Sequence, residues 1–363
     1  MNANSTSSIV KHPGEKIADC IQILGMSQKE LSIRTGFSEK HISTVLNGSK
    51  DVSITFAKRV ENATGLSAEK LMQEQVRYDA FQFEKEERNH IQAEEFSILR
   101  QLHDVSGYLK KINLLGKTKD EIDAIVEIRK FLGVSNLCTI PEITYNAAYR
   151  AQVKSNSRVN PYVLFAWVRM CERLTDHIDI ASTVNTKKLR NNLPKIKELM
   201  FAKAHTIQTG LRKLFAECGI AFKVVEHFVG APVQGFIKES HENRLILCLT
   251  VRQKRQDIFW FTLFHEIAHI LHGDVKQRFV DFSVKSDMEA EADVFAGEVL
   301  LPSEAYRQFL LKRDTSFDAI HRFAMSQGVP DHIVIGRLLR DEFLSYNTEV
   351  AKRLPKYILS SAA

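Results

Sequence analysis

Residues 259–272 read FWFTLFHEIAHILH, and this stretch decides the fold of the second half of the chain. It contains the pattern His-Glu-x-x-His. Positions i and i+4 share one face of a helix, so His265 and His269 can bind one metal ion. Glu266 follows the first histidine and can reach a water held by that metal. Two imidazoles, a third protein ligand and an open position suit zinc, and the apolar flanks predict a buried helix.

Residues 287–302 read DMEAEADVFAGEVLLP and predict a second helix with an apolar stripe. Glu289 and Asp293 lie four residues apart and share a face of that helix. A carboxylate from a second helix is the usual third zinc ligand beside His-Glu-x-x-His. Glu289 is therefore the expected ligand and Glu291 the alternative. Asp293 can accept the free N–H of a ligand histidine and fix its tautomer. An ordinary acidic helix face is the competing interpretation.

These two segments resemble the ImmA/IrrE metallopeptidases. The resemblance is carried by HEIAHILHGD at 265–274 and EAEADVFAGEVLLP at 289–302, and it covers roughly Leu211 to Leu339. It implies a gluzincin-like fold, with a small sheet packed on the two helices and one Zn²⁺. It also implies cleavage of specific protein partners, often transcriptional repressors. By position it implies that His265, His269 and Glu289 are ligands and that Glu266 is the general base.

Two further histidines lie near this region in the sequence. His332 could approach the zinc and stabilise the oxyanion of the tetrahedral intermediate, or it could be a helix-capping or surface histidine. His272 follows His269 by three residues on the same helix, and we expect it beside the ligand set rather than in it.

Composition and charge are those of a globular protein of two or three domains. The chain has 363 residues, a net charge of +6 and a pI near 8.9, which permits a nucleic-acid partner without requiring one. Its five cysteines are scattered, as in a reducing cytosol. The polar N-terminus and the lack of a long apolar run lead us to expect a cytoplasmic protein with no membrane partner.

The first 80 residues predict five short helices. Ser27-Gln-Lys-Glu30 is a capping box, Gly36 ends the helix that it opens, and Ser38 begins the next. This helix, short turn and helix between Ser27 and Leu46 form the helix-turn-helix arrangement. The expected core positions are Leu31, Ile33, Phe37, Ile42, Val45 and Leu46.

The second helix of such a pair enters the major groove with its N-terminal residues at base edges. Those residues here are Ser38, Glu39, Lys40, His41, Ser43 and Thr44, while Gln28 would reach a phosphate. Residues 26–67 resemble the XRE, or lambda-repressor-like, DNA-binding domain, notably its antitoxin HigA branch. The resemblance implies a double-stranded DNA operator and a homodimer. A helical domain that only dimerises is the alternative.

The whole chain is predicted to be α+β and mostly α. We expect a disordered arm at 1–10, the helix-turn-helix domain at 11–78, a helical middle region at 79–205, the peptidase-like domain at 206–345 and a tail at 346–363. Strands are expected at 221–229, 235–238 and 244–250, with Gly230 to Gly235 as an edge that could hold a substrate backbone. One long helix is expected at 193–218.

Two functions agree with these patterns. The first is a zinc endopeptidase that cleaves a regulatory protein, such as a repressor or antitoxin, and is fused to a DNA-binding domain. The second is a transcriptional regulator or antitoxin-like protein whose zinc domain senses or binds a partner without proteolysis. Glu266 favours the first, because a sensing domain has no need of a general base.

Overall fold

The computed structural model describes residues 10–143, 159–181, 183–239, 244–251, 254–273 and 286–356. The chain forms two compact units, Met1–Ala93 and Glu94–Ala363. The predicted arm, apart from its last residue, and the end of the predicted tail lie outside the described residues. Among the described helices, none is both long and apolar enough to cross a membrane.

The first unit contains the five helices that the sequence predicts. They are α1 (Pro13–Ile23), α2 (Gln28–Thr35), α3 (Glu39–Leu46), α4 (Ile54–Thr64) and α5 (Ala68–Asn89). Serine hydroxyls cap α2 to α5, and those of Ser27 and Ser38 accept hydrogen bonds from the backbone N–H of Glu30 and His41. Gly36 ends α2 in the left-handed conformation, with φ 69°.

The core of this unit differs from the expectation at one position. Leu31, Ile42 and Val45 are fully buried, but Ile33 is 74% exposed. The buried residues of α2 are Leu31 and Thr35, which are four residues apart and share one face. Ile33 lies midway between them and therefore points away from the core, so its predicted burial is wrong.

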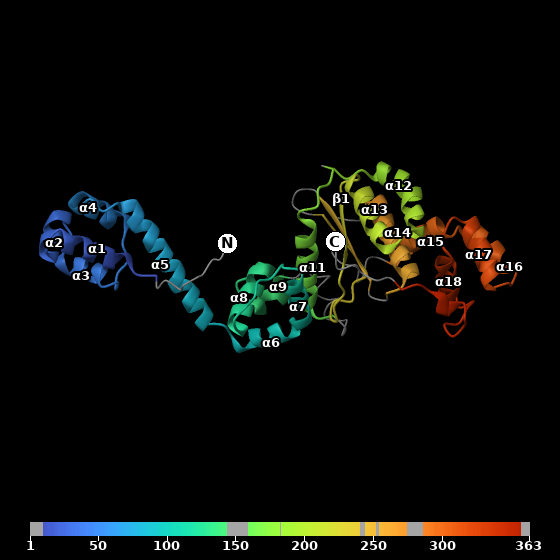
Figure 1. Cartoon of the computed structure of the whole chain (residues 1–363), viewed down its shortest axis with the longest axis horizontal. Helices are drawn as coiled ribbons and strands as arrows, with labels where there is room; N and C mark the ends of the chain where they lie inside the picture. Colours follow the sequence, from blue (N-terminus) through green and yellow to red (C-terminus); the bar gives the residue numbers. More distant parts are fainter. Residues whose placement is uncertain are drawn as a thin grey trace. The chain divides into compact units, whose positions relative to one another are not determined.

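The second unit begins with helices and ends with helices around a small sheet (Figure 1). Before the sheet come α6 (Ala93–Gln101), α7 (His103–Lys111), α8 (Glu121–Leu132), η1 (Leu137–Thr139), α9 (Ile140–Ile143), α11 (Pro161–Thr175), α12 (Thr186–Glu198), η2 (Leu199–Phe201) and α13 (Ala204–Ala216). After it come α14 (Gln256–His272), α15 (Ser286–Leu300), α16 (Ser303–Leu311), α17 (Phe317–Ser326), α18 (Asp331–Arg340) and η4 (Ala351–Arg353).

The sheet has the strand order β1–β3–β2, so β2 lies at an edge. Its strands are β1 (Ile220–Val225), β2 (Gly235–Glu239) and β3 (Leu245–Thr250). β3 runs parallel to β1 and antiparallel to β2, with Leu247 opposite Phe222 and Ile237. Every residue of β3 is buried, as expected for a central strand covered on both faces.

Each face of the sheet packs on different helices. Phe222 stacks on Phe215 of α13 at 5.0 Å between ring centroids, and its face joins the core that includes Trp260 and Leu263 of α14. On the other face, Trp167 of α11 meets Phe236 edge-on at 5.5 Å. The sheet therefore lies between α11 and the pair α13 and α14, as the ribbon shows (Figure 1).

Most of the region 79–205 clusters with the residues that follow it. The expected boundary at residue 78 falls inside α5, and the first unit ends at Ala93. From Glu94 onward the chain clusters with the sheet. Fully buried Glu95 of α6 pairs with Arg129 of α8 and accepts from the backbone N–H of Leu137, which ties these elements together.

The long helix expected at 193–218 is two helices. α12 ends at Glu198, a short 3₁₀ turn follows at Leu199–Phe201, and α13 starts at Ala204. Ala202 and Lys203 are extended, with ψ 166° and 153°. The apolar spacing continues across this break because both helices bury the same side against the core. Periodicity alone therefore gave no sign of the turn.

Candidate metal centre

α14 carries the centre of the site because its sequence forces it into the core. Apolar side chains surround the helix, and Trp260, Phe264 and Ile267 are fully buried. His265, Glu266 and His269 are therefore held among apolar neighbours, with exposed fractions of 7%, 2% and 0%. Gly273 ends the helix in the left-handed conformation, at φ 83°.

Three potential metal ligands converge on one point. Nε2 of His265 lies 3.1 Å from Nε2 of His269 and 3.0 Å from Oε2 of Glu289, while His269 Nε2 lies 3.5 Å from Glu289 Oε1. Tetrahedral ligands at zinc–ligand distances of about 2.0–2.1 Å would stand about 3.3 Å apart. The donor set thus fits zinc in both chemistry and spacing.

Asp293 lies behind this cluster, where the sequence predicts it. Its Oδ1 is 2.9 Å from Nδ1 of His265. This contact favours a proton on Nδ1 and leaves the Nε2 lone pair directed at the cluster. Burial lowers the pKa of His265, but the hydrogen bond to Glu289 and the charges of Glu266, Glu289 and Asp293 outweigh it and raise that pKa.

Arg340 of α18 is a residue of this site that the sequence did not indicate. Its Nη2 donates to Oδ2 of Asp293 at 3.0 Å, and its guanidinium lies 4.7 Å from the ring centroid of Phe261. Phe261 in turn faces His265 one turn further along α14, at 6.3 Å between rings. Arg340 is 47 residues from Asp293 in the sequence, and no motif links them.

Glu266 lies against the start of the edge strand. A Cβ atom on Gly235, the first residue of β2, would stand 2.0 Å from Oε1 of Glu266. Any larger residue at this point of the strand would therefore force the Glu266 side chain to shift. The predicted general base and the predicted substrate edge meet here, beside the metal cluster.

The other sequence candidates lie elsewhere. His332 is buried on α18 beside Asp257, which precedes His265 on α14 by more than two turns, and the metal-ligand group does not include it. His272 meets Phe295 edge-on at 6.1 Å. Glu291 is exposed, as expected of a surface charge, whereas Glu289 faces the histidines.

The proposed DNA-contacting residues occupy two environments. Two of them, His41 and Thr44, are half-buried; Gln28 on α2, Ser38 at the N-cap of α3, and Lys40 and Ser43 within α3 are exposed. His41 stacks on Phe37 at 4.6 Å and lies 5.3 Å from Phe56. Burial, together with the charge of Lys50, lowers the pKa of His41, so this ring packs as a neutral group.

Comparison with known proteins identifies one segment of the second unit. Residues 223–332 match the family model Peptidase_M78, described as an IrrE N-terminal-like domain. This segment, which includes the end of β1, both other strands, α14 and α15, is an IrrE/ImmA-like domain of metallopeptidase type. A search of curated proteins finds no match for the chain.

Proposed function

We propose that this protein is a zinc-dependent endopeptidase of the gluzincin type that cleaves a specific regulatory protein, such as a repressor or an antitoxin. One observation carries the proposal. The metal-ligand set of His265, His269 and Glu289 lies directly beside Glu266, and Glu266 lies against the sheet edge at Gly235.

The residues divide the chemistry among them. A zinc ion at this cluster would polarise a carbonyl group and make water more acidic. Glu266 takes a proton from the attacking water and delivers it to the leaving amine of the cleaved bond. Asp293 holds His265 in one tautomer and orientation through the contact at Nδ1.

The edge strand supports an extended protein substrate. β2 pairs only with β3 among the described strands, so its outer edge can accept a further strand by backbone hydrogen bonding. Gly235 brings that edge to within contact of Glu266. A peptide added to β2 would therefore carry its amide groups past the general base, in an arrangement that any extended sequence can adopt.

We further propose that the first unit binds a palindromic operator as a homodimer in the cytoplasm. The exposed side chains of Ser38, Lys40 and Ser43 at the N-terminal part of α3 support this, because that part of a recognition helix reaches base edges. DNA binding would bring the peptidase domain to the regulatory proteins that occupy the same operators.

The test compares two carboxylate substitutions. Glu266→Gln leaves the ligand set intact, so the protein should keep its zinc, lose cleavage by ~10²–10⁴-fold or more, and retain its substrate in a pull-down. Glu289→Gln replaces an anionic ligand with a neutral one, so zinc should bind more weakly and excess zinc should restore part of the activity.

Metal analysis and cleavage of the captured partner on a gel are the measurements. Protein purified without chelator should contain about one zinc per chain, and His265→Ala or His269→Ala should remove it. If Glu266→Gln cleaves the captured partner at the wild-type rate, the hydrolytic mechanism is wrong and the sensing function takes its place.

A further inference from the structure

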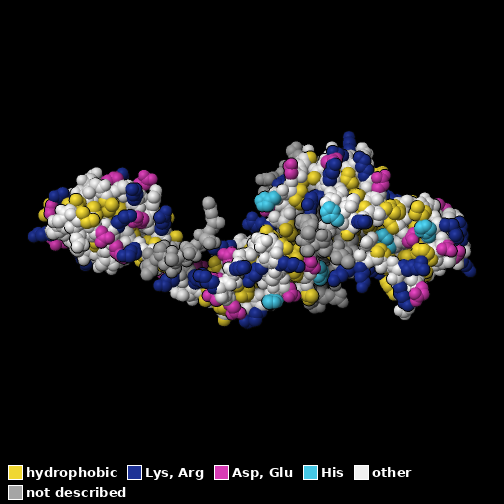
Figure 2. All heavy atoms as spheres, in the orientation of Figure 1, with side chains coloured by type: hydrophobic (Ala, Val, Ile, Leu, Met, Phe, Trp, Pro, Cys, Tyr) yellow, Lys and Arg dark blue, Asp and Glu magenta, His cyan; other side chains and the backbone are white. Residues whose placement is uncertain are grey.

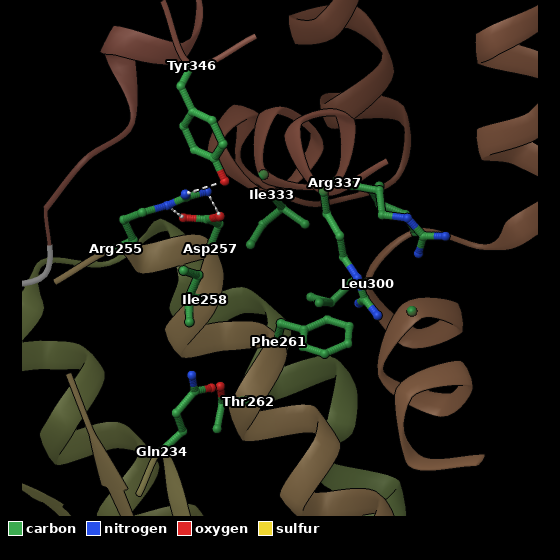
Figure 3. Close-up of a pocket in the computed structure, with 14 residues that line it drawn as sticks. Gln234, Arg255, Asp257, Ile258, Phe261, Thr262, Leu300, Ile333, Arg337 and Tyr346 are labelled. Atoms are coloured by element: carbon green, nitrogen blue, oxygen red, sulfur yellow. Dashed lines mark hydrogen bonds and ion pairs between the residues drawn. The ribbon is translucent and has the colours of Figure 1, made fainter. Parts of the chain in front are cut away.

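A cavity opens beside the metal cluster, between α14, α15 and α18 (Figure 3). Its volume is about 390 Å³, within the range of roughly 300–1,000 Å³ typical of small-molecule sites. Its apolar wall consists of Ile258, Phe261, Leu300, Leu301 and Ile333. Three arginines, at 255, 337 and 340, also line it.

Each nitrogen of the Arg255 guanidinium has a partner at one end of the cavity. Its Nε and Nη2 donate to the two carboxylate oxygens of Asp257, and its Nη1 lies 3.3 Å from the hydroxyl of Tyr346 (Figure 3). Gly336 makes this end compact, because a Cβ there would stand 2.2 Å from Asp257 Oδ2. These groups form a closed polar wall with no net charge.

Arg337 and Arg340 are placed differently, because each uses part of its guanidinium on a carboxylate and keeps other N–H groups. Nε of Arg337 donates to Asp341 at 2.6 Å, and Nη1 extends over Gly297 in the wall of the cavity, where a Cβ would stand at 3.2 Å. Arg340 uses Nη2 on Asp293. Each guanidinium carries five N–H donors, so both retain donors for a ligand.

The N–H groups that Arg337 and Arg340 keep select the ligand. Asp257, Asp341 and Asp293 each pair with one of the three arginines, so the wall has no surplus positive charge, and it suits a ligand with a single negative charge better than one with two. A planar carboxylate matches the guanidinium fork. The apolar wall, with the Phe261 ring under Arg340, calls for an aliphatic or aromatic body.

We propose that this cavity binds a small monoanionic carboxylate with an apolar body, its head held by Arg337 and Arg340. Side chains of Arg340 and Tyr346 that are 51% and 63% exposed provide an entrance from solvent. The ligand and Asp293 would both bind Arg340, and Asp293 also contacts Nδ1 of His265, so the ligand site is linked to the metal cluster through these two residues. The binding proposal does not depend on whether the domain cleaves protein.

Binding of matched acids and alcohols to the full chain tests the proposal. We would measure 3-phenylpropionate and octanoate against 3-phenylpropan-1-ol and 1-octanol by calorimetry, with a thermal shift as the second readout. Each acid should bind at least tenfold more tightly than its alcohol, because the two differ only in the group that faces the arginines.

Substitutions locate the bound head group. Arg337→Gln should lower the affinity for the acids at least tenfold and leave the affinity for the alcohols within about twofold of the wild-type value. Arg337→Lys keeps the positive charge but loses the forked pair of donors, so it should lower the affinity for the acids less. If Arg337→Gln fails to fold, Arg337→Lys takes its place in the test. Arg322→Gln, on exposed α17 surface outside the cavity, is the matched control and should bind like the wild type.

Three results would each overturn the proposal. The first is equal binding of acid and alcohol, and the second is wild-type affinity of Arg337→Gln for the acids. The third is absence of any heat or thermal shift with either acid at millimolar concentration. The predicted loss of cleavage in Glu266→Gln is independent of all three, so the two proposals can fail separately.

Discussion

His332 shows how burial sets the charge of a single residue. Its side chain is 8% exposed, and burial lowers its pKa to about 4 although Asp257 and Asp331 act in the opposite direction. An unfolded chain returns it to a pKa of about 6.5. Below that pH the unfolded state binds the extra proton, so the stability of this unit must fall as the pH falls toward 4.

We predict that His332→Gln removes part of this pH dependence. Between pH 7 and pH 5 the histidine should cost the wild type about 2 kcal/mol of unfolding free energy that the variant does not lose. Denaturant unfolding of both proteins at equal zinc content measures the difference. His205→Gln, on the exposed surface of α13, is the control and should follow the wild type. Parallel slopes for His332→Gln and the wild type would contradict the assigned burial effect.

The sequence indicates most of the metal site at this scale, and for a physical reason. Residues four apart on a helix must share a face, so the pattern around His265 and the pair Glu289 and Asp293 determine which groups can meet. The structure brings these groups together. Arg340 could not be anticipated, because only the packing of α18 against α14 and α15 brings it to Asp293. For His332 the sequence left open an oxyanion role and a capping or surface position, and the structure buries it on α18 beside Asp257.

At the scale of elements, the meeting of β2 with α14 is the decisive contact. Alternation along β2 places Gly235 and Ile237 on the face that covers α14, and Ile237 joins the core there. A side chain at 235 would occupy the volume of the Glu266 carboxylate. The strand therefore approaches the helix closely enough to position the Glu266 carboxylate, our proposed general base.

We predict that Gly235→Ala lowers cleavage at least tenfold while zinc content stays at the wild-type level. The added methyl group displaces Glu266 but touches none of the three ligands. Gly116→Ala is the control, because the nearest atom to its new methyl would be Glu127 Oε2 at an ordinary 3.8 Å. Metal analysis and the cleavage assay decide the matter. Full activity in Gly235→Ala would show that β2 does not hold Glu266 in place.

Sequence patterns predicted elements better than their boundaries. The serine caps and glycines of the first unit mark chemically distinct ends, and its five helices appear where those residues lie. The break between α12 and α13 carries no such signal, since Leu199, Met200 and Phe201 continue the apolar spacing through a 3₁₀ turn. The end of β1 likewise has no signal in the sequence. The alternation predicts a strand to residue 229, but β1 ends at Val225.

At the scale of the whole molecule, the two units carry very different charge. Residues 1–93 contain twelve Lys or Arg and twelve Asp or Glu, so the net charge of +6 resides in residues 94–363. Figure 2 shows both signs mixed over the visible face of the first unit. Phosphate attraction is the main source of non-specific DNA affinity. A neutral first unit should therefore bind DNA through few phosphate contacts and depend largely on base contacts.

This charge balance shapes our prediction for DNA binding. The full chain should footprint a palindromic operator as a dimer, with two half-sites about one helical turn apart. Lys40→Gln and Ser43→Ala should relax base preference, because both side chains are exposed on α3. Gln28→Ala, at the proposed phosphate contact, should weaken binding evenly across sequences.

Salt titration separates this arrangement from a general basic surface. Each phosphate contact contributes about −0.9 to the slope of log affinity against log salt concentration, so a first unit acting alone should give a shallow slope. The second unit offers a different source of attraction, since residues 186–216 carry eight Lys or Arg and one acidic residue, Glu198. Lys187→Gln with Arg190→Gln should leave operator affinity and slope unchanged if only α2 and α3 contact DNA. A steep slope that these two substitutions reduce would instead assign the phosphate contacts to α12, and a chain with no footprint on any DNA would exclude the operator-binding role.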